Sequence, residues 1–172
     1  LETDGLSING TTVTASAAEL NLLDGVTTLA TFGSNSAGMS GNNAGIGQDA
    51  LGSLTSGDYN TAYGRSALQA NTSGAENTAT GYRALFSNTT GSYNTATGAD
   101  ALKANTTGSY STANGLQAIF NNTTGSGHTA SGWRALFSNT TGSYNTAFGN
   151  GALYSNTTAS ENSAFGYRAL YN

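Results

Sequence analysis

The sequence predicts an all-β fold, a β-solenoid or β-roll in which each 17-residue repeat forms one coil. Two observations support this: a glycine recurs every 17 residues without insertion or deletion, and an apolar residue follows each glycine four places on. A strict period indicates one structural unit stacked many times. The glycines are Gly47, Gly64, Gly81, Gly98, Gly115, Gly132, Gly149 and Gly166. The apolar residues are Leu51, Leu68, Leu85, Leu102, Ile119, Leu136, Leu153 and Leu170.

The repeat reads Asn-Thr-Ala-x-Gly-x-x-Ala-Leu-x-x-Asn-Thr-Thr-Gly-Ser-Tyr, and we number its positions 1 to 17. Seven complete coils occupy residues 43–161, and a partial eighth follows to residue 172. Positions 1, 3 and 5 keep small residues, whereas position 4 varies. This two-residue alternation predicts a short strand. We expect its fixed face to pack inside and position 4 to face solvent or a partner.

The other two parts of the repeat predict a core residue and a turn. The leucine at position 9 is the one large apolar residue kept in nearly every coil, so we expect it to fill the interior. Asn-Thr-Thr-Gly-Ser is turn chemistry, because asparagine can hydrogen-bond nearby backbone and glycine accepts positive φ. Seventeen residues are too few for the helix pairs of longer repeats.

Residues 1–41 depart from the repeat and form a separate N-terminal connector ahead of the shaft at 42–172. Residues 6–14 predict a β-hairpin that turns at Asn9-Gly10. Ser16 and Glu19 have capping-box spacing, which predicts a short helix over residues 17–23. Residues 33–42 have the composition of a linker. Because the sequence starts at Leu1 and stops within a repeat, we expect a piece of a longer polypeptide.

Composition narrows the functional classes. Charged residues are 8% of the chain, the net charge is -4, and there are five Lys and Arg in 172 residues. That is too few for the basic footprint of a nucleic-acid partner. Cysteine is absent, which excludes disulfides and thiolate metal sites. No apolar run approaches the ~20 residues of a membrane span, so membrane insertion is not expected.

We expect no catalytic, cofactor-binding or metal-binding residues, and no enzymatic activity. The lone histidine, His128, stands where most coils have asparagine, which favours a hydrogen-bonding substitute over a catalyst. No Ser-His-Asp or paired-carboxylate arrangement can be assembled around it. Six asparagines at position 12 begin N-x-S/T sequons, which we interpret as turn-forming residues, with glycosylation as the alternative. They are Asn71, Asn88, Asn105, Asn122, Asn139 and Asn156.

Aromatic residues recur in columns. Such stripes on a single chain would be large exposed apolar patches, which usually mark interfaces. The sequence therefore predicts a homo-oligomer and, for a rod, a homotrimer. One column, at position 17, is Tyr59, Tyr93, Tyr110 and Tyr144. The candidate interface or receptor contacts, at positions 6 and 10, are Tyr82, Phe86, Phe120, Trp133, Phe137, Tyr154, Tyr167 and Tyr171.

Two segments resemble known families. Residues 14–27, with Glu19-Leu20-Asn21-Leu22-Leu23-Asp24-Gly25 at their centre, resemble a motif of bacteriophage tail-fibre proteins. The tandem repeat over 43–172 is similar to repeats of phage fibres that end in an intramolecular chaperone domain. It is similar, more loosely, to the β-roll of trimeric autotransporter adhesin heads. These resemblances imply a trimeric, extended, host-facing fibre.

The sequence thus favours a structural segment of a trimeric virion fibre, a phage tail fibre, that spaces and presents host-attachment tips. Its expected partners are further copies of itself and other virion tail proteins. The alternative is an adhesin or receptor-binding head at a bacterial or extracellular surface, with the aromatic columns contacting host glycans or surface proteins. A polysaccharide-cleaving tailspike is disfavoured because the sequence offers no paired-carboxylate constellation.

Overall fold

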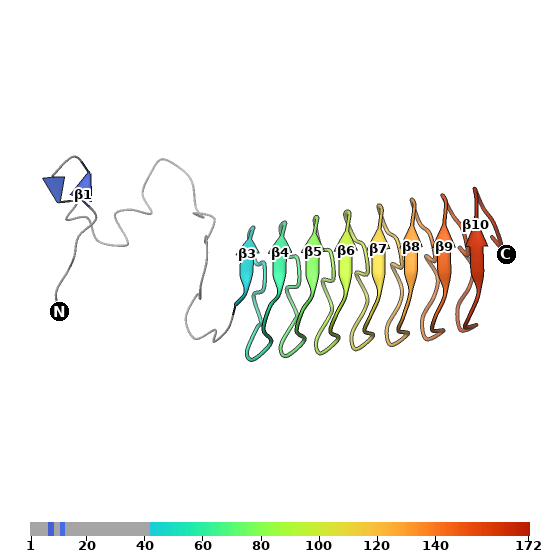
Figure 1. The fold of residues 1–172 in the computed structure, drawn as a ribbon, viewed down its shortest axis with the longest axis horizontal. Helices are drawn as coiled ribbons and strands as arrows, with labels where there is room; N and C mark the ends of the chain where they lie inside the picture. The colour runs from blue at the N-terminus through green and yellow to red at the C-terminus, as the bar shows by residue number, and fades with distance from the viewer. Residues whose placement is uncertain (1–6, 9–10, 13–41) are drawn as a thin grey trace.

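The chain forms a β-solenoid in a computed structural model that describes residues 42–172 and two short N-terminal strands. Eight strands, one per coil, build a single parallel sheet along a rod (Figure 1). The described residues contain no helix, so the fold is all-β as the repeat predicts. The strands of the rod are β3 (Ala44–Ile46), β4 (Thr61–Tyr63), β5 (Thr78–Thr80), β6 (Thr95–Thr97), β7 (Thr112–Asn114), β8 (Thr129–Ser131), β9 (Thr146–Phe148) and β10 (Ser163–Phe165).

The register of the sheet follows the 17-residue period throughout. Ala62 of β4 pairs with Ala79 of β5, which pairs with Ala96 of β6, and the same step holds at every junction. Sheet order follows chain order from β3 to β10. Each repeat therefore advances the rod by one strand spacing, ~4.8 Å. This is the rise of a coil that winds around the rod axis, and it excludes a chain that runs extended along the axis.

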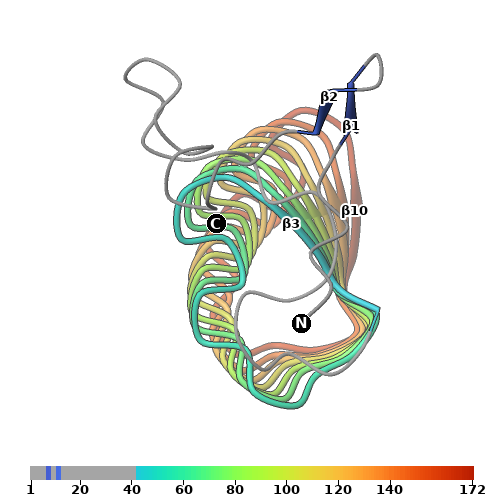
Figure 2. The same cartoon turned by 90° about the vertical axis from the view of Figure 1, so that its left-hand side faces the viewer.

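The coil bonds to its neighbours outside the strands as well. The backbone N–H of Leu68 donates to the carbonyl of Ala84 in the next coil, and that of Thr72 donates to Thr89. Seen along the rod, successive coils lie over one another with the same outline (Figure 2). Hydrogen bonds along the axis thus hold both the turns and the sheet of every coil in place.

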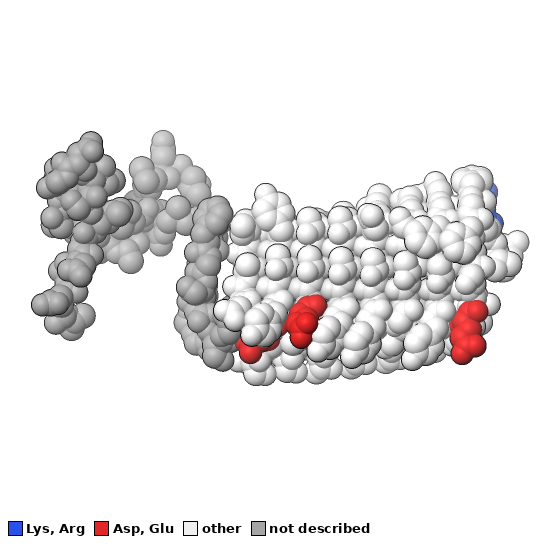
Figure 3. Space-filling view, in the orientation of Figure 1, with Lys and Arg blue, Asp and Glu red and all other residues white. Residues whose placement is uncertain are grey.

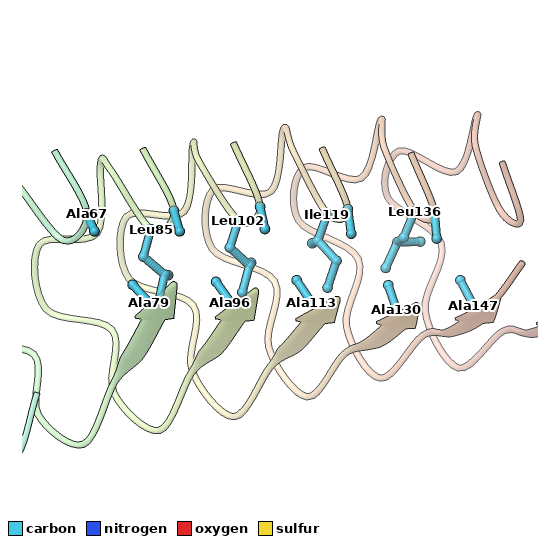
Figure 4. Close-up of a cluster of buried hydrophobic side chains, with 14 of the residues drawn as sticks. Ala67, Ala79, Leu85, Ala96, Leu102, Ala113, Ile119, Ala130, Leu136 and Ala147 are labelled. Carbon is cyan, nitrogen blue, oxygen red and sulfur yellow. The ribbon is translucent and has the colours of Figure 1, made fainter. Parts of the chain in front are cut away.

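Two tight turns follow each strand and shape the apolar end of the coil. In the second coil, Ala67 N–H donates to Gly64 O at 3.2 Å and Asn71 N–H donates to Leu68 O at 3.1 Å. The leucine at position 9 adopts positive φ between these turns, 51° at Leu68 and 50° at Leu102. This left-handed backbone aims the leucine side chain into the coil, where it meets the strand alanine (Figure 4).

The core is one apolar column that the coil encloses by itself. The alanines at positions 3 and 8 and the leucine at position 9 form a continuous buried cluster from Leu51 to Ala164. Leu68, Leu85, Leu102, Ile119 and Leu136 are 0% exposed, which confirms the predicted interior role. Leu170 in the eighth coil is 58% exposed because no described coil covers it. One chain is sufficient to bury the leucine column, so partner chains are not needed for that.

Outside the rod, the predicted hairpin is confirmed. Strand β1 (Ser7–Ile8) pairs antiparallel with β2 (Thr11–Thr12), with Ile8 opposite Thr11, which is the register that a turn at residues 9–10 demands. The predicted helix over residues 17–23 and nearly all of the predicted linker over 33–42 lie outside the described residues.

The glycine at position 5 is fixed by the close approach of successive coils. Gly98 has φ of +128°, and a Cβ built on it would lie 2.6 Å from the carbonyl oxygen of Gly115. An alanine side chain there would meet backbone, which cannot move aside without disturbing the ladder. Two separate features therefore require glycine at this position: its positive φ and the short distance to the next coil.

We predict that Gly98→Ala lowers the free energy of unfolding by about 3 kcal/mol or more, from backbone strain and steric overlap. The matched control is Gly52→Ala, because Gly52 is exposed and its position holds Gln69 and Phe86 in the next coils. The control should change stability by about 0.5 kcal/mol or less. Thermal unfolding followed by circular dichroism measures both, and equal losses would contradict the stacking argument.

Candidate functional site

Two columns of buried asparagine fill the polar half of each coil. The first, at position 1, includes Asn60, Asn77, Asn94 and Asn145, and the second, at position 12, includes Asn71, Asn88, Asn105, Asn122 and Asn139; all are 0% exposed. They bond to their own coil and to the coil before. Their burial places an amide network inside the rod beside the leucine column.

The first column bonds through both backbone and side chain. The backbone N–H of Asn77 donates to Oδ1 of Asn60 at 3.0 Å, and its Nδ2 donates to the same oxygen at 3.1 Å. Nδ2 of Asn77 also donates to the carbonyl of Gly91 in its own coil, at 2.9 Å. That carbonyl accepts a second bond from Asn88 of the other column. Asparagine suits this arrangement because one amide supplies both donors and an acceptor.

The second column forms a chain of amides along the rod. Nδ2 of Asn105 donates to Oδ1 of Asn88 at 2.8 Å and to the carbonyl of Gly108 at 2.9 Å. Its Oδ1 accepts from Asn122 at 2.8 Å. The bond from each side chain to the carbonyl three residues on confirms the predicted turn role. These asparagines begin the N-x-S/T sequons, so in the folded rod the sequon amides between Asn71 and Asn139 are buried and engaged.

His128 continues the first column in the sixth coil. It is 1% exposed, its backbone N–H donates to Oγ of Ser111, and its Nδ1 accepts the backbone N–H of Asn145 at 3.3 Å. Nε2 lies 3.3 Å from Nδ2 of Asn139. Burial lowers the pKa of His128 to about 4, against a smaller opposing effect of backbone hydrogen bonding at Gly142 and Asn145. The ring is therefore neutral at pH 7 and acts as a hydrogen-bonding substitute, as the sequence predicts.

The outer surface carries a feature that we name the cation–aromatic strip: the residues at positions 6, 7 and 10. It contains all five cationic residues of the chain and all eight candidate contact aromatics of positions 6 and 10. The cations are Arg65, Arg83, Lys103, Arg134 and Arg168. Two carboxylates, Asp49 and Asp100, also occupy the strip, which leaves it with a net charge of +3.

Contacts within the cation–aromatic strip run along the rod. Four rings of position 10 stack in succession with centroids about 5 Å apart, close to the spacing of the coils. The guanidinium of Arg134 lies 4.9 Å from the Trp133 ring and 5.1 Å from the Phe137 ring, so it joins positions 6 and 10. Arg83 pairs with Asp100 at 2.9 Å. The stacked rings are Phe120, Phe137, Tyr154 and Tyr171.

A second surface, the acid–tyrosine strip, consists of positions 16 and 17. It holds three carboxylates and no cation, a net charge of -3, and it presents the four tyrosines of position 17. Tyr93 and Tyr110 stack at 4.9 Å. A side-chain hydrogen bond with Glu76 and its negative charge raise the pKa of Tyr93. The carboxylates are Asp58, Glu76 and Glu161.

The two strips have net charges of opposite sign, although two of the five carboxylates of the rod lie among the cations. In Figure 3 acidic side chains follow the lower border of the visible face, and basic side chains are visible only at the upper border near the C-terminal end. The low overall charge conceals this segregation. The signal was present in the sequence, since every Lys and Arg falls at position 6, 7 or 10, but the turns are needed to show that these positions share a surface.

The described residues hold no group of three or more His, Asp or Glu side chains close enough to bind a metal ion. Nor does this part of the chain contain a helix with the length and apolar character of a membrane span. Comparisons with protein-family models, with curated proteins and with solved structures gave no match. The two strips and the two asparagine columns are the features of the rod that bear on its function.

We predict that Asn105→Asp lowers the free energy of unfolding by about 3 kcal/mol or more at pH 7. The carboxylate has no N–H to donate, so Oδ1 of Asn88 and the carbonyl of Gly108 each lose a hydrogen bond. It would also place a negative charge beside these two oxygens at a buried site. Denaturant titration measures the loss. Asn114→Asp, at an exposed strand position, is the control and should be nearly neutral. A similar effect of both changes would contradict the role given to the buried ladder.

We also predict that His128 makes the rod sensitive to acid. Its folded pKa is about 4, whereas an unfolded histidine has a pKa of about 6.5. Between these values the unfolded chain binds the proton more strongly than the folded chain does. The free energy of unfolding therefore falls by about 3 kcal/mol as the pH drops from 6.5 towards 4. The groups that these contacts bring to the ring, the side-chain amide of Asn139 and the backbone N–H of Asn145, are neutral, so neither offsets the cost with a charge.

His128→Asn restores the consensus and removes this contribution. Melting temperatures of the two proteins at pH 7 and pH 4 isolate the effect, because carboxylates elsewhere titrate equally in both. The variant should lose less stability on acidification than the parent. Identical losses would show that His128 is not the acid-sensitive group.

Proposed function

We propose that this chain is a structural segment of an extended, trimeric virion fibre of the phage tail-fibre type, which spaces and presents host-attachment tips. The observation that supports this best is the unbroken register of the sheet, from β3 to β10, with no coil that departs from the period. A rod of this kind has a length set by its number of coils, and length is what a spacer provides. The resemblance of residues 14–27 and of the tandem repeat to phage fibre sequences points the same way.

The interior supports a mechanical role. Bending or stretching the rod has to strain the strand ladder and the asparagine columns together, because the ladder and the first column connect every coil to the next and the second column connects the second to the seventh coil. The seven complete coils span roughly 34 Å at ~4.8 Å per coil. In repeat proteins stability comes largely from neighbouring units, so stiffness is expected to extend along the whole stack.

The aromatic surface supports assembly into a trimer. Tyr110 and Tyr144 are each 66% exposed, and Tyr167 is 71% exposed. Large exposed aromatic columns usually mark a contact with another molecule. Because one chain buries its own leucine column, the added chains would thicken and stiffen a rod whose coils are already closed.

A second candidate function is the adhesin or receptor-binding role, in which the aromatic columns contact host glycans. The specific observation in its favour is Trp133, whose ring is 45% exposed beside the guanidinium of Arg134. An aromatic face beside a hydrogen-bond donor is suited to stacking on a sugar ring. Binding of the purified chain to a glycan array tests this second function.

The spacer function is tested by removing one whole coil, residues 94–110, which carries none of the candidate contact aromatics. Deletion joins Tyr93 to Ser111 and keeps the period, so the rod should fold and become shorter by ~4.8 Å. Cryo-electron microscopy measures the length, and sedimentation measures the mass of the assembly. The matched control deletes residues 94–101 alone, which breaks the register and should destroy the fold of the rod beyond that point.

Particles assembled with the 17-residue deletion should still adsorb to host cells, because a spacer tolerates one missing coil. A chain that sediments as a compact monomer, or a deletion that abolishes adsorption while the rod remains folded, would contradict the spacer function.

A further inference from the structure

The described rod is neutral as a whole, yet its two charged strips are opposite in sign. The cation–aromatic strip carries +3 and the acid–tyrosine strip carries -3, and together they hold every charged side chain of residues 42–172. Both strips also present aromatic rings. Each therefore has the charge and the apolar character that would complement the other.

We propose that the cation–aromatic strip of one copy docks against the acid–tyrosine strip of a second, parallel copy, and that this contact repeats around the fibre. The proposal rests on the trimeric fibre proposed above and assigns the surfaces that would hold it together. A contact between two different surfaces is heterologous, and it closes into a ring when the rotation between copies returns to the start. Three copies would then satisfy all strips.

No ion pair joins the two strips of one copy within the described residues. Position 17 precedes each three-residue strand and position 6 follows it, and the ion pair found among the described residues, Arg83 with Asp100, lies within the cation–aromatic strip. The sheet lies between the two strips. The carboxylates of the acid–tyrosine strip are therefore left to pair with cations of a different molecule.

In the second coil the charges match by level when two copies lie parallel and in register, whereas the first coil carries a carboxylate on both strips, Asp49 and Asp58. Arg65 and Glu76 belong to the same coil, the second. Glu161 belongs to the seventh coil, between the levels of Arg134 and Arg168. A charge-matched contact of this kind fixes register and suppresses wrong pairings.

Two of the four tyrosines of the acid–tyrosine strip also match aromatic residues by level. Tyr93 and Tyr144 face levels that carry aromatic residues at positions 6 and 10 of the other strip. The fifth coil has Gly127 where most coils have tyrosine, and at that level the other strip presents Leu116, an exposed apolar side chain. A missing ring on one strip would leave room for the leucine of the other.

A long polyanion fits the cation–aromatic strip less well than a second copy does. Arg83 is already paired with Asp100, and Nε of Arg134 donates to Gln117 at 2.7 Å. Two of the five cations thus have partners within the chain, and two carboxylates lie among them. A partner whose charges are few and placed at matching levels is the better complement.

The test exchanges the charges of the second coil in the full chain. Arg65→Glu places two carboxylates opposite each other in every contact, and Glu76→Arg places two cations there. We expect each single variant to raise the concentration at which half of the chains dissociate by at least about tenfold. The double variant Arg65→Glu/Glu76→Arg restores opposite charges and should return that concentration to near the parent value. Analytical ultracentrifugation at low salt measures it.

Both side chains are exposed, so the coil should fold in all variants, and circular dichroism verifies this. Asn114→Glu, on the exposed strand face, is the matched control and should leave assembly unchanged. A parent chain that is monomeric overturns both this assignment and the trimeric fibre. A trimeric parent with unaffected single variants, or with a double variant that is not rescued, overturns the strip assignment alone.

The same variants decide whether the strip binds a glycan instead. If Arg65→Glu abolishes binding to an acidic polysaccharide and leaves the trimer intact, the strip is a glycan site and the docking of a second copy is wrong. If the trimer weakens with the charge exchange and recovers in the double variant, the contact is between copies.

Discussion

The structure depends on one constraint: the buried asparagine side chains of each coil bond to the equivalent residues one coil away. Asn77 bonds to Asn60 and Asn88 to Asn71, in each case across 17 residues. Because a buried amide without a partner costs free energy, a substitution in one coil also destabilises the coil that bonds to it. The constraint explains why the period tolerates no insertion. One added residue would shift an asparagine out of both columns and leave two amides unsatisfied.

The close spacing of the coils is the second consequence of this ladder. Identical backbone segments lie one strand spacing apart, so glycines at position 5 and position 15 stand against the next coil's carbonyl oxygens without room for a Cβ. The same spacing makes equivalent aromatic rings stack, as Phe137 does on Tyr154 with planes 4° apart. A single geometric step thus dictates small residues inside the corners and permits columns of rings outside.

Much of this fold could be predicted from the sequence because the period carries the register. The strand at positions 2 to 4, the leucine interior and the asparagine turn at Asn71 each follow from residue type and alternation. The left-handed backbone at Leu102 and Ile119 could not be predicted, since non-glycine residues seldom adopt positive φ and Ile119 is also β-branched. There the paired turns and the buried apolar side chain override local preference.

The candidate surfaces were harder to predict than the core. Arg65 and Arg83 occupy positions 6 and 7 and Lys103 occupies position 10, so no simple periodicity unites them in the sequence. Only the two turns after each strand bring these positions onto one face. The aromatic columns were visible as repeats, but which charges accompanied them depended on the path of the coil.

The division between ladder and surface also explains where this rod can encode specificity. Stacking restricts the residue type at positions 1, 3, 5, 8, 9, 12 and 15. These positions are therefore nearly the same in every coil and hardly distinguish one coil from another. Positions 4, 6, 10 and 17 face outward or are partly exposed, and they differ from coil to coil, as does position 7, where Ser66 and Asp100 are buried. Register between two identical rods can be set only by such differences, because a perfectly uniform rod would slide by one coil without loss. The irregular residues Arg65, Glu76, Gly127 and Glu161 are therefore the features that could fix one axial alignment.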